Sequence, residues 1–419
     1  MKISRIRSQI VALPADEPLA GAAENPSGTR PIVTLEVETD DGIVGIGVTY
    51  FGGAMTGTLK SAVDELGAQL VGEDPLRVEA AAEKLRTAAG SAGPGGIFHL
   101  ALSALDMALW DIRSKALNLP LWKLLGGARE RVPTYASGAL MRGLSLDRVV
   151  SAAATLKEKG FREMKTQLAL PGETTPAKEV ERMRRVREAI GPDIRLMCDI
   201  NQRWRVEQAI DIGKRVEDAG VGLFWLEDVT SADDYPGLAR VTAALSTPVA
   251  GGEYLWGLVP FRHMVEARSV DIVMIDLVRV GGITQWLKVA GMAEAFNLPV
   301  VSHLIPEVHV HLIGAIPNGL TVEYMPWLRH LEHAVRRLRH CLPQRKEARH
   351  VFDSEAVRHG ADKVDMNLGH AVAHDRKVEG LGHAGDLEPM GDAARAHLID
   401  RHDIDRARLD HVTERHDAP

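Results

Sequence analysis

The 419-residue sequence predicts an α/β protein: a small α+β domain (residues 1–128), a parallel barrel (residues 129–329) and an atypical tail (residues 330–419). Three observations support this prediction. An Asp-Gly turn separates apolar alternations near the amino terminus, which is typical of an antiparallel hairpin. From about residue 129, short apolar runs alternate with helical stretches, as in βα units. After Arg329 the residue composition changes abruptly.

The amino-terminal domain begins with alternating segments at Met1–Leu13 and Pro31–Val48, the second broken by Asp40-Asp41-Gly42. These segments predict a small antiparallel sheet. Apolar residues then recur with helical spacing over His99–Asn118, until Pro120 ends the pattern. Two glycine-rich segments are candidates for loops that close over a site, namely Ala15–Arg30 and Tyr50–Gly57.

The second domain contains eight short apolar runs, each of the length of a strand. Eight parallel strands are what closing a barrel requires. The expected strands are Val132–Ser137, Phe161–Gln167, Ile194–Asp199, Leu223–Glu227, Pro248–Glu253, Ile272–Asp276, Val300–His303 and Thr321–Tyr324.

The tail after Arg329 holds 12 of the 17 histidines, 12 arginines and one aromatic residue, Phe352, in 90 residues. It has no strong helical or strand period. Three explanations remain open: a disordered appendage, a segment translated out of frame, and a histidine-rich metal-binding tract.

Composition excludes several functional classes. The 50 Lys and Arg against 57 Asp and Glu give a net charge of −7, so the chain has no basic excess for a nucleic acid. Two cysteines, Cys198 and Cys341, cannot build a disulfide framework. Neither a signal peptide nor a membrane span of about 18 apolar residues is evident. We expect a soluble cytoplasmic protein with no nucleic-acid or membrane partner.

Ionisable residues close seven consecutive strand runs. In a βα barrel the carboxyl ends of the strands meet at the active site. A single such residue is usually a helix cap or part of a rim salt bridge, but seven would bury like charges at one mouth unless a cation lay among them. These residues are Lys165, Asp199, Glu227, Glu253, Asp276, His303 and Glu323.

Three carboxylates on adjacent strands, Asp199, Glu227 and Glu253, predict a metal site. Without sulfur or imidazole ligands, they suit a hard cation, Mg²⁺ first. Such a metal can chelate a substrate carboxylate and act as a Lewis acid. The neighbouring Asp228 is expected to point to the opposite face of its strand.

The remaining ionisable residues suit abstraction of a proton next to a carboxylate. Asp276 on the sixth strand can orient His303 on the seventh, which makes His303 a candidate base. Lys165 on the second strand is expected to face His303 across the barrel mouth, and a base on each side of the substrate would settle the stereochemistry. Glu323 could donate a hydrogen bond to an enolate oxygen if neighbouring negative charge keeps it protonated.

In these residues and their order, the chain resembles the enolase superfamily, mandelate racemase subgroup. The resemblance covers residues 1 to about 329. It implies a capping domain followed by a TIM-like (β/α)₇β barrel, Mg²⁺, and a homo-oligomer, either a dimer or an octamer. Within the subgroup, the stretches DINQRW, LVRVGGIT and SHLIPEVHVHL are most similar to acid-sugar dehydratases of the talarate and galactarate type.

One departure from the subgroup bears on the reaction. The subgroup has Lys-x-Lys at the end of the second strand, where this chain has Lys165-Thr166-Gln167. Because Gln167 cannot accept a proton, the chemistry is expected to run through His303 alone. That favours dehydration of an aldonic or aldaric acid to a 2-keto-3-deoxy acid. A racemase or epimerase using Lys165 as second base, and a catalytically impaired member of the superfamily, are the alternatives.

Three further residues are candidates for contacts with a small acid-sugar substrate. Gln167 can donate a hydrogen bond. Asn201, two residues after Asp199, could support the metal site or contact the substrate. Arg279 could reach a distal substrate carboxylate or form a rim salt bridge.

Overall fold

The computed structural model describes residues 1–325, with the exception of positions 16, 18, 23–27, 51, 94 and 173. In the tail it also describes the backbone of three residues. The chain begins with a three-stranded antiparallel sheet of β1 (Ile3–Pro14), β2 (Thr29–Thr39) and β3 (Val44–Thr49). The expected hairpin is confirmed, and Gly42 in its turn has φ 88°.

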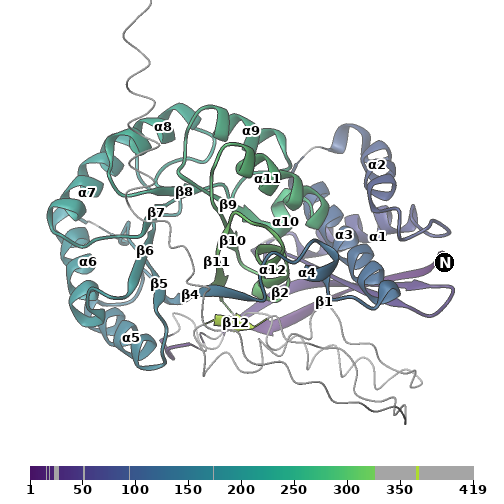
Figure 1. The fold of residues 1–419 in the computed structure, drawn as a ribbon, viewed down its shortest axis with the longest axis horizontal. Coiled ribbons are helices and arrows are strands. Elements are labelled where there is room, and N and C mark those ends of the chain that lie inside the picture. The colour runs from purple at the N-terminus through teal and green to yellow at the C-terminus, as the bar shows by residue number, and fades with distance from the viewer. Residues whose placement is uncertain are drawn as a thin grey trace, which may run out of the picture. The chain divides into compact units, whose positions relative to one another are not determined.

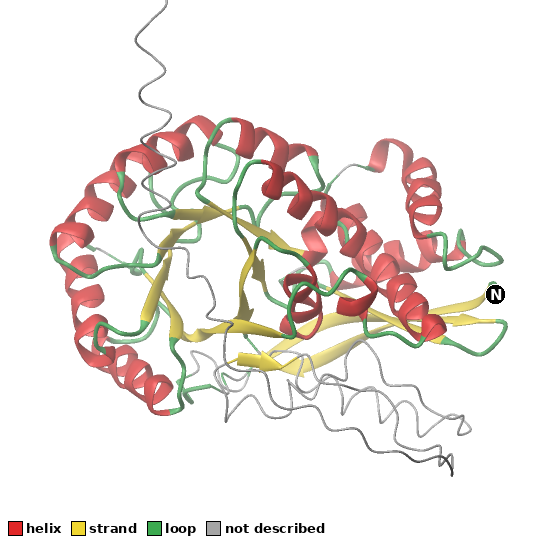
Figure 2. Cartoon of the chain, in the orientation of Figure 1, coloured by secondary structure: helices red, strands yellow, loops and turns green. Residues whose placement is uncertain are grey.

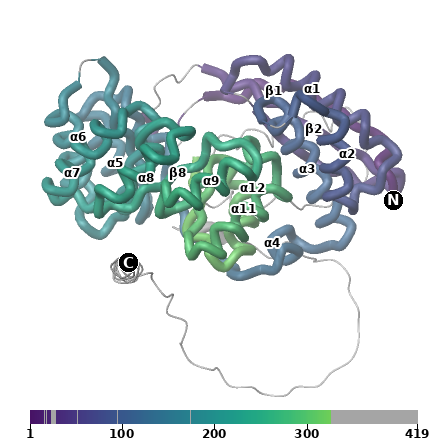
Figure 3. Tube along the Cα trace, turned by 90° about the horizontal axis from the view of Figure 1, so that it is seen from above, coloured from purple at the N-terminus to yellow at the C-terminus, as the bar shows by residue number. Residues whose placement is uncertain are grey.

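Two helices pack against this sheet, α1 (Thr56–Ala68) and α3 (Gly96–Leu117), and α2 (Val78–Ala89) packs against these helices (Figure 3). The long helix α3 is the one expected from the apolar spacing, and it is buried along most of its length. Glycine is needed where β3 crosses it, because a Cβ at Gly47 would lie 2.0 Å from the backbone oxygen of Ala104. The short η1 (Gly90–Ala92) and α4 (Leu121–Leu124) complete this domain.

Eight parallel strands close into a barrel, which confirms the predicted architecture (Figures 1 and 2). The last strand pairs with the first, Glu323 opposite Tyr135. The strands are β4 (Arg131–Leu140), β5 (Glu163–Gln167), β6 (Arg195–Asp199), β7 (Trp225–Glu227), β8 (Val249–Gly251), β9 (Ile272–Asp276), β10 (Val300–His303) and β11 (Gly319–Tyr324).

Helices connect successive strands on the outside of the barrel, giving the (β/α)₇β order (Figure 2). Large side chains, among them Tyr135, Met197 and Trp225, fill the barrel interior, so it is a packed core that supports a site at one end. The helices are α5 (Leu146–Glu158), α6 (Pro176–Ile190), α7 (Val206–Asp218), α8 (Tyr235–Ala244), α9 (Val259–Glu266), α10 (Leu277–Val280), α11 (Ile283–Ala295) and α12 (Pro306–Ala315).

The fifth barrel strand is shorter than predicted. We expected a strand over Pro248–Glu253, but β8 ends at Gly251, because Gly252 has φ 124° and turns the chain out of the sheet. A side chain at position 252 would place its Cβ 2.6 Å from the backbone oxygen of Met274. The turn therefore requires glycine, and Glu253 follows it.

The tail predictions lie almost wholly outside the described residues. Only the backbone of β12 (Asp365–Asn367) is described there, and it pairs antiparallel with the first residues of β4. Among the described residues, no helix is both long and apolar enough to cross a membrane.

Candidate active site

A cavity of about 800 Å³ opens at the carboxyl ends of the barrel strands. The amino-terminal domain contributes Thr29, Arg30 and Tyr50, so the described parts of both glycine-rich segments reach it. Most of the predicted site residues line the same cavity, namely Lys165, Gln167, Asp199, Asn201, Glu253, Arg279, His303 and Glu323. The structure therefore brings the predicted residues together at one mouth, with Glu227 and Asp276 just behind them.

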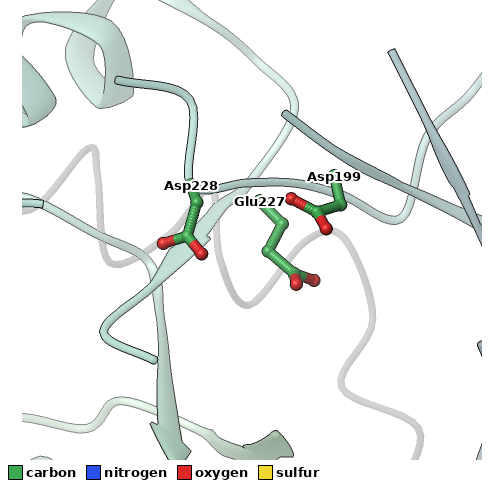
Figure 4. A group of neighbouring side chains, drawn as sticks. All are labelled: Asp199, Glu227 and Asp228. Carbon is green, nitrogen blue, oxygen red and sulfur yellow. The ribbon is translucent and has the colours of Figure 1, made fainter. Parts of the chain in front are cut away.

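Three buried carboxylates, Asp199, Glu227 and Asp228, each offer an oxygen within 4.8 Å of the others (Figure 4). Asp199 ends β6 and Glu227 ends β7. The indole of Trp225 holds Glu227 from below, donating from Nε1 to Oε2 at 3.0 Å. Asp228 joins them because its φ of 44° breaks the strand alternation. The expectation that its side chain points to the opposite face of the strand is therefore wrong.

The third predicted ligand, Glu253, lies beside this trio and faces the cavity. Its carboxylate is close enough to be repelled by the charges of Asp228, Glu227 and Asp199. Glu253 Oε2 lies 3.3 Å from His303 Nε2 and makes no hydrogen bond within the described residues. Glu253 is thus between the other carboxylates and the candidate base.

Four buried carboxylates in this space create an excess of negative charge. Burial raises the pKa of Glu227 to about 7, and burial together with the neighbouring carboxylates raises the pKa of Asp228 and of Glu253 well above its ordinary value. Asp228 Oδ2 has no hydrogen-bond partner among the described residues. Oxygen ligands of this density fit a hard divalent cation, which would supply the missing positive charge.

The Lys165 side chain lies inside the barrel between two carboxylates. Its Nζ is 2.5 Å from Glu227 Oε1 and 2.8 Å from Glu323 Oε1, and it lies 5.5 Å from the centre of the Tyr135 ring. Burial acts against the charged form, but the two carboxylates hold the pKa of Lys165 well above its ordinary value. These contacts favour the ammonium form of Lys165, which suits a cation that stabilises negative charge on a substrate.

The expectation of a protonated Glu323 is wrong. Burial favours the neutral acid, but Lys165, together with His303, lowers the pKa of Glu323 to about 2. Its Oε1 accepts from Ser137 Oγ at 2.7 Å, and its Oε2 accepts from the backbone N–H of Leu304 at 2.7 Å. With donors on both oxygens, Glu323 is a carboxylate that holds the ammonium ion in place.

His303 and Asp276 form the predicted pair at the ends of β10 and β9. His303 Nδ1 lies 2.6 Å from Asp276 Oδ2. Asp276 Oδ1 accepts from the backbone N–H groups of Val278 and Arg279. Burial favours the neutral acid, but the charge of Arg279 and the hydrogen bond to His303 lower the pKa of Asp276 below its ordinary value. Asp276 is therefore ionised and accepts a hydrogen bond from Nδ1, so that Nε2 is the nitrogen on the side of Glu253 and the cavity.

The three predicted substrate contacts also line the cavity. Gln167 Nε2 donates to Asn201 Oδ1 at 3.1 Å. Arg279 makes the rim salt bridge that was one of its two alternatives, with Nη1 3.4 Å from Asp276 Oδ2, and its guanidinium stacks on Tyr254. Sequence reasoning missed Tyr254, although it directly follows Glu253.

Comparison with known proteins places the chain in a family. A family model described as "Mandelate racemase / muconate lactonizing enzyme, N-terminal domain" matches residues 7–126, and one described as "Enolase C-terminal domain-like" matches residues 148–353. L-talarate/galactarate dehydratase of Salmonella typhimurium is 32% identical over 332 residues, covering 78% of this chain and 82% of the relative. D-galactarolactone cycloisomerase of Agrobacterium fabrum is 34% identical, covering 73% and 79%.

Solved structures agree with these matches. L-talarate dehydratase from a Polaromonas species, complexed with Mg and L-glucarate, superposes with a TM-score of 0.72 at 32% identity, covering 79% of this chain and 88% of that one. A racemase from Streptomyces coelicolor with bound magnesium gives 0.71 at 31% identity, covering 77% and 89%. Capping domain, barrel and family matches thus lead to one conclusion: the chain belongs to the mandelate racemase subgroup of the enolase superfamily.

Proposed function

We propose that the chain is a Mg²⁺-dependent dehydratase of an acid sugar, an aldonic or aldaric acid, and forms a 2-keto-3-deoxy acid. One observation carries the proposal. The cavity presents an oriented imidazole, His303, whereas Gln167 occupies the position from which a lysine base would act in the subgroup. Dehydration needs a base on one face of the α-carbon, whereas racemisation needs one on each.

The metal would be held by Asp199, Glu227 and Glu253. Asp199 and Glu253 line the cavity, whereas Glu227 and Asp228 do not. With Glu253 rather than Asp228 as the third ligand, the metal would lie nearer the cavity, where a substrate carboxylate can reach it. When bound, Mg²⁺ supplies positive charge that stabilises the enolate formed from the carboxylate. Asp228 would add negative charge from behind, which strengthens the attraction for a cation.

His303 would act as the base. Its Nε2 takes the α-proton, while ionised Asp276 stabilises the imidazolium through Nδ1. The C–H electron pair forms the enolate, which collapses by expelling the β-hydroxyl as the imidazolium returns the proton to it. Water leaves, and the enol that remains tautomerises to the 2-keto acid. The same nitrogen thus removes the proton and protonates the leaving group.

Lys165 would stabilise the enolate electrostatically. Its ammonium is fixed by Glu227 and Glu323 and lines the cavity. A buried cation that is already oriented pays no reorganisation cost when charge develops on the substrate carboxylate. Glu323 acts through Lys165 as a positioning residue.

A substrate screen tests the proposal. Purified protein with Mg²⁺ is incubated with a panel of aldonic and aldaric acids, and 2-keto acids are detected with semicarbazide. We expect a signal that disappears with chelator and in His303→Asn, and that persists in His263→Asn, which changes an exposed histidine on α9. Full turnover by His303→Asn would show that another group is the base.

Racemisation or epimerisation is the second candidate, favoured by the similarity to a racemase structure. A third possibility is an impaired member of the superfamily. Incubation in deuterated water separates the three. A 2-keto acid indicates dehydration, an inverted α-carbon indicates epimerisation, and α-deuterium without product indicates a half-active site. We also propose a homo-oligomer, either a dimer or an octamer, which light scattering of the purified protein would test.

A further inference from the structure

Arg142 lies in the loop after β4, behind the wall of the cavity. A second arginine, Arg182 on α6, fixes this loop: its Nη1 donates to the oxygen of Leu144 at 2.9 Å and its Nη2 to the oxygen of Met141 at 2.7 Å. The backbone is thus held on both sides of Arg142. The Arg142 side chain is itself partly buried, so its guanidinium has a defined place.

Arg142 donates to both amide side chains of the site. Its Nη2 donates to Asn201 Oδ1 at 2.5 Å, and its backbone N–H donates to Gln167 Oε1 at 3.2 Å. The same Nη2 approaches the backbone oxygen of Asp199 at 3.4 Å. Both amides line the cavity and Arg142 does not, so it contacts them from the side away from the substrate space.

These contacts fix which end of each amide faces the cavity. An amide can bind by its oxygen or its nitrogen, but an arginine side chain and a backbone N–H only donate. The Asn201 oxygen accepts from Arg142 and from Gln167 Nε2, and the Gln167 oxygen accepts from Arg142. Both oxygens are therefore taken by donors of the protein.

The nitrogens retain donor capacity. Asn201 Nδ2 makes a contact of 3.5 Å with Tyr254 Oη, and the second contact of Gln167 Nε2 is 3.5 Å to Asp199 Oδ2. Both distances are at the long limit of a hydrogen bond, so a substrate oxygen can compete for these hydrogens. The wall beside the carboxylates thus offers N–H groups.

We propose that Arg142 is a positioning residue that locks Gln167 and Asn201 as hydrogen-bond donors toward hydroxyl or carboxylate oxygens of the substrate. The inference rests on the proposed function, because it concerns how the same cavity binds an acid sugar. The inference also gives Gln167 a role although it cannot act as a base: its amide N–H donates a hydrogen bond to a substrate oxygen.

The first test needs no substrate. Crystal structures of the Mg²⁺-loaded protein are compared for wild type and Arg142→Met, with Arg148→Met, an exposed arginine on α5, as the matched control. We expect the Asn201 side chain, which loses the guanidinium donor, to rotate in Arg142→Met and to keep its place in the control. Gln167 keeps the backbone N–H of position 142 and should move only as its partner Asn201 moves. Unchanged hydrogen bonds around both amides in Arg142→Met would overturn the proposal.

The second test is a double-mutant cycle with galactarate and Mg²⁺. We expect Arg142→Met to raise KM about tenfold to a hundredfold, the loss for a hydrogen bond to a charged group, with a much smaller change in kcat. Arg142→Lys retains a donor and should recover part of the affinity. If Arg142 acts through Asn201, adding Arg142→Met to Asn201→Ala should change KM little further. Fully additive effects would count against the proposal.

The two tests separate failure of this inference from failure of the proposed function. If wild-type protein neither binds nor converts galactarate or any acid of the panel, the proposed function fails, and the amide orientations in the crystal structures alone decide the role of Arg142. If wild type is active and Arg142→Met matches it in KM and in structure, the inference fails and the dehydratase proposal stands.

Discussion

Asp106 of the capping-domain helix α3 supplies the amino-terminal cap of the barrel helix α11. Asp106 Oδ2 accepts from the backbone N–H of Thr284 at 3.0 Å, and Oδ1 accepts from its hydroxyl at 2.5 Å. Trp110, one turn further along α3, donates to the same hydroxyl at 2.9 Å. The residue before α11 is Gly282, where a Cβ would lie 2.5 Å from Asp106 Oδ2. Gly282 therefore has no side chain with which to cap α11, and Asp106 of the other domain caps the helix in its place.

Asp106 should make stability depend on pH. Burial raises its pKa to about 6, above the ordinary 3.8. The folded state therefore holds a proton that the unfolded state has lost, and this contribution to stability is complete below pH 3.8 and disappears as pH rises through 6. Between pH 4 and pH 7, the free energy of unfolding of the wild type should fall by about 3 kcal/mol through Asp106, and Asp106→Asn should not show this fall. Urea unfolding at several pH values would measure it. Asp233→Asn, at an exposed position, should leave the pH dependence unchanged.

The fold followed from the sequence where its elements are repetitive. Short apolar runs identified all eight barrel strands, because strands buried on both faces read as continuous apolar segments. The docking of the two domains could not be predicted in this way. It depends on Asp106 meeting Thr284, 178 positions apart, and no local pattern marks such a pair.

The metal site gives a prediction that does not depend on turnover. Because the buried carboxylates repel one another, Mg²⁺ should raise Tm, and EDTA should reverse the gain. Glu253→Gln should abolish Mg²⁺ binding measured by calorimetry, whereas Asp228→Asn, behind the cavity wall, should weaken it by less. Asp211→Asn, on the exposed face of α7, is the control. The opposite ranking of the two variants would assign the third ligand to Asp228.

Replacing Gln167 by lysine tests the hypothesis that His303 is the one base of the site. Wild type should exchange the α-proton on one face, so acid sugar recovered from deuterated water keeps its configuration. In Gln167→Lys, the amine would lie beside Asn201, which accepts from the Arg142 guanidinium, and that charge disfavours a second cation. The nearest carboxylate, Asp199, would be engaged as a metal ligand. We expect the α-epimer to appear in the NMR spectrum of the recovered acid for this variant. Gln69→Lys, on the surface, should produce none. Epimer formed by wild type would contradict the prediction.

The chemistry of the site was predictable to the extent that it follows strand ends. Asp199, Glu227, Asp276 and His303 end their strands, and the topology alone brings them together. The position of Asp228 was not predictable, because it depends on a left-handed backbone conformation. The ionisation of Glu323 was missed for another reason. Its charge is set by contacts with Lys165, Ser137 and Leu304, which come from three other parts of the chain.

Helix α12 contains two buried histidines, His309 and His311, that should make the protein sensitive to acid. Burial lowers the pKa of each to about 4, below the ordinary 6.5. Between these values the unfolded state binds protons that the folded state does not, so stability is complete above pH 6.5 and is lost as pH falls toward 4. Neither ring nitrogen of His311 has a hydrogen-bond partner among the described residues. Burial of this imidazole therefore also costs desolvation free energy that no hydrogen bond offsets.

His311→Leu should raise the free energy of unfolding and reduce its loss in acid, by about 3 kcal/mol between pH 7 and pH 4. Glu307 on the same helix opposes this trend, because burial raises its pKa to about 7 and favours folding as pH falls. The difference between variant and wild type at each pH cancels that contribution and isolates His311. His263→Leu, at an exposed histidine, should show no such difference. If urea unfolding at pH 7, 6 and 5 gave parallel curves for His311→Leu and wild type, His311 would not be neutral in the folded protein.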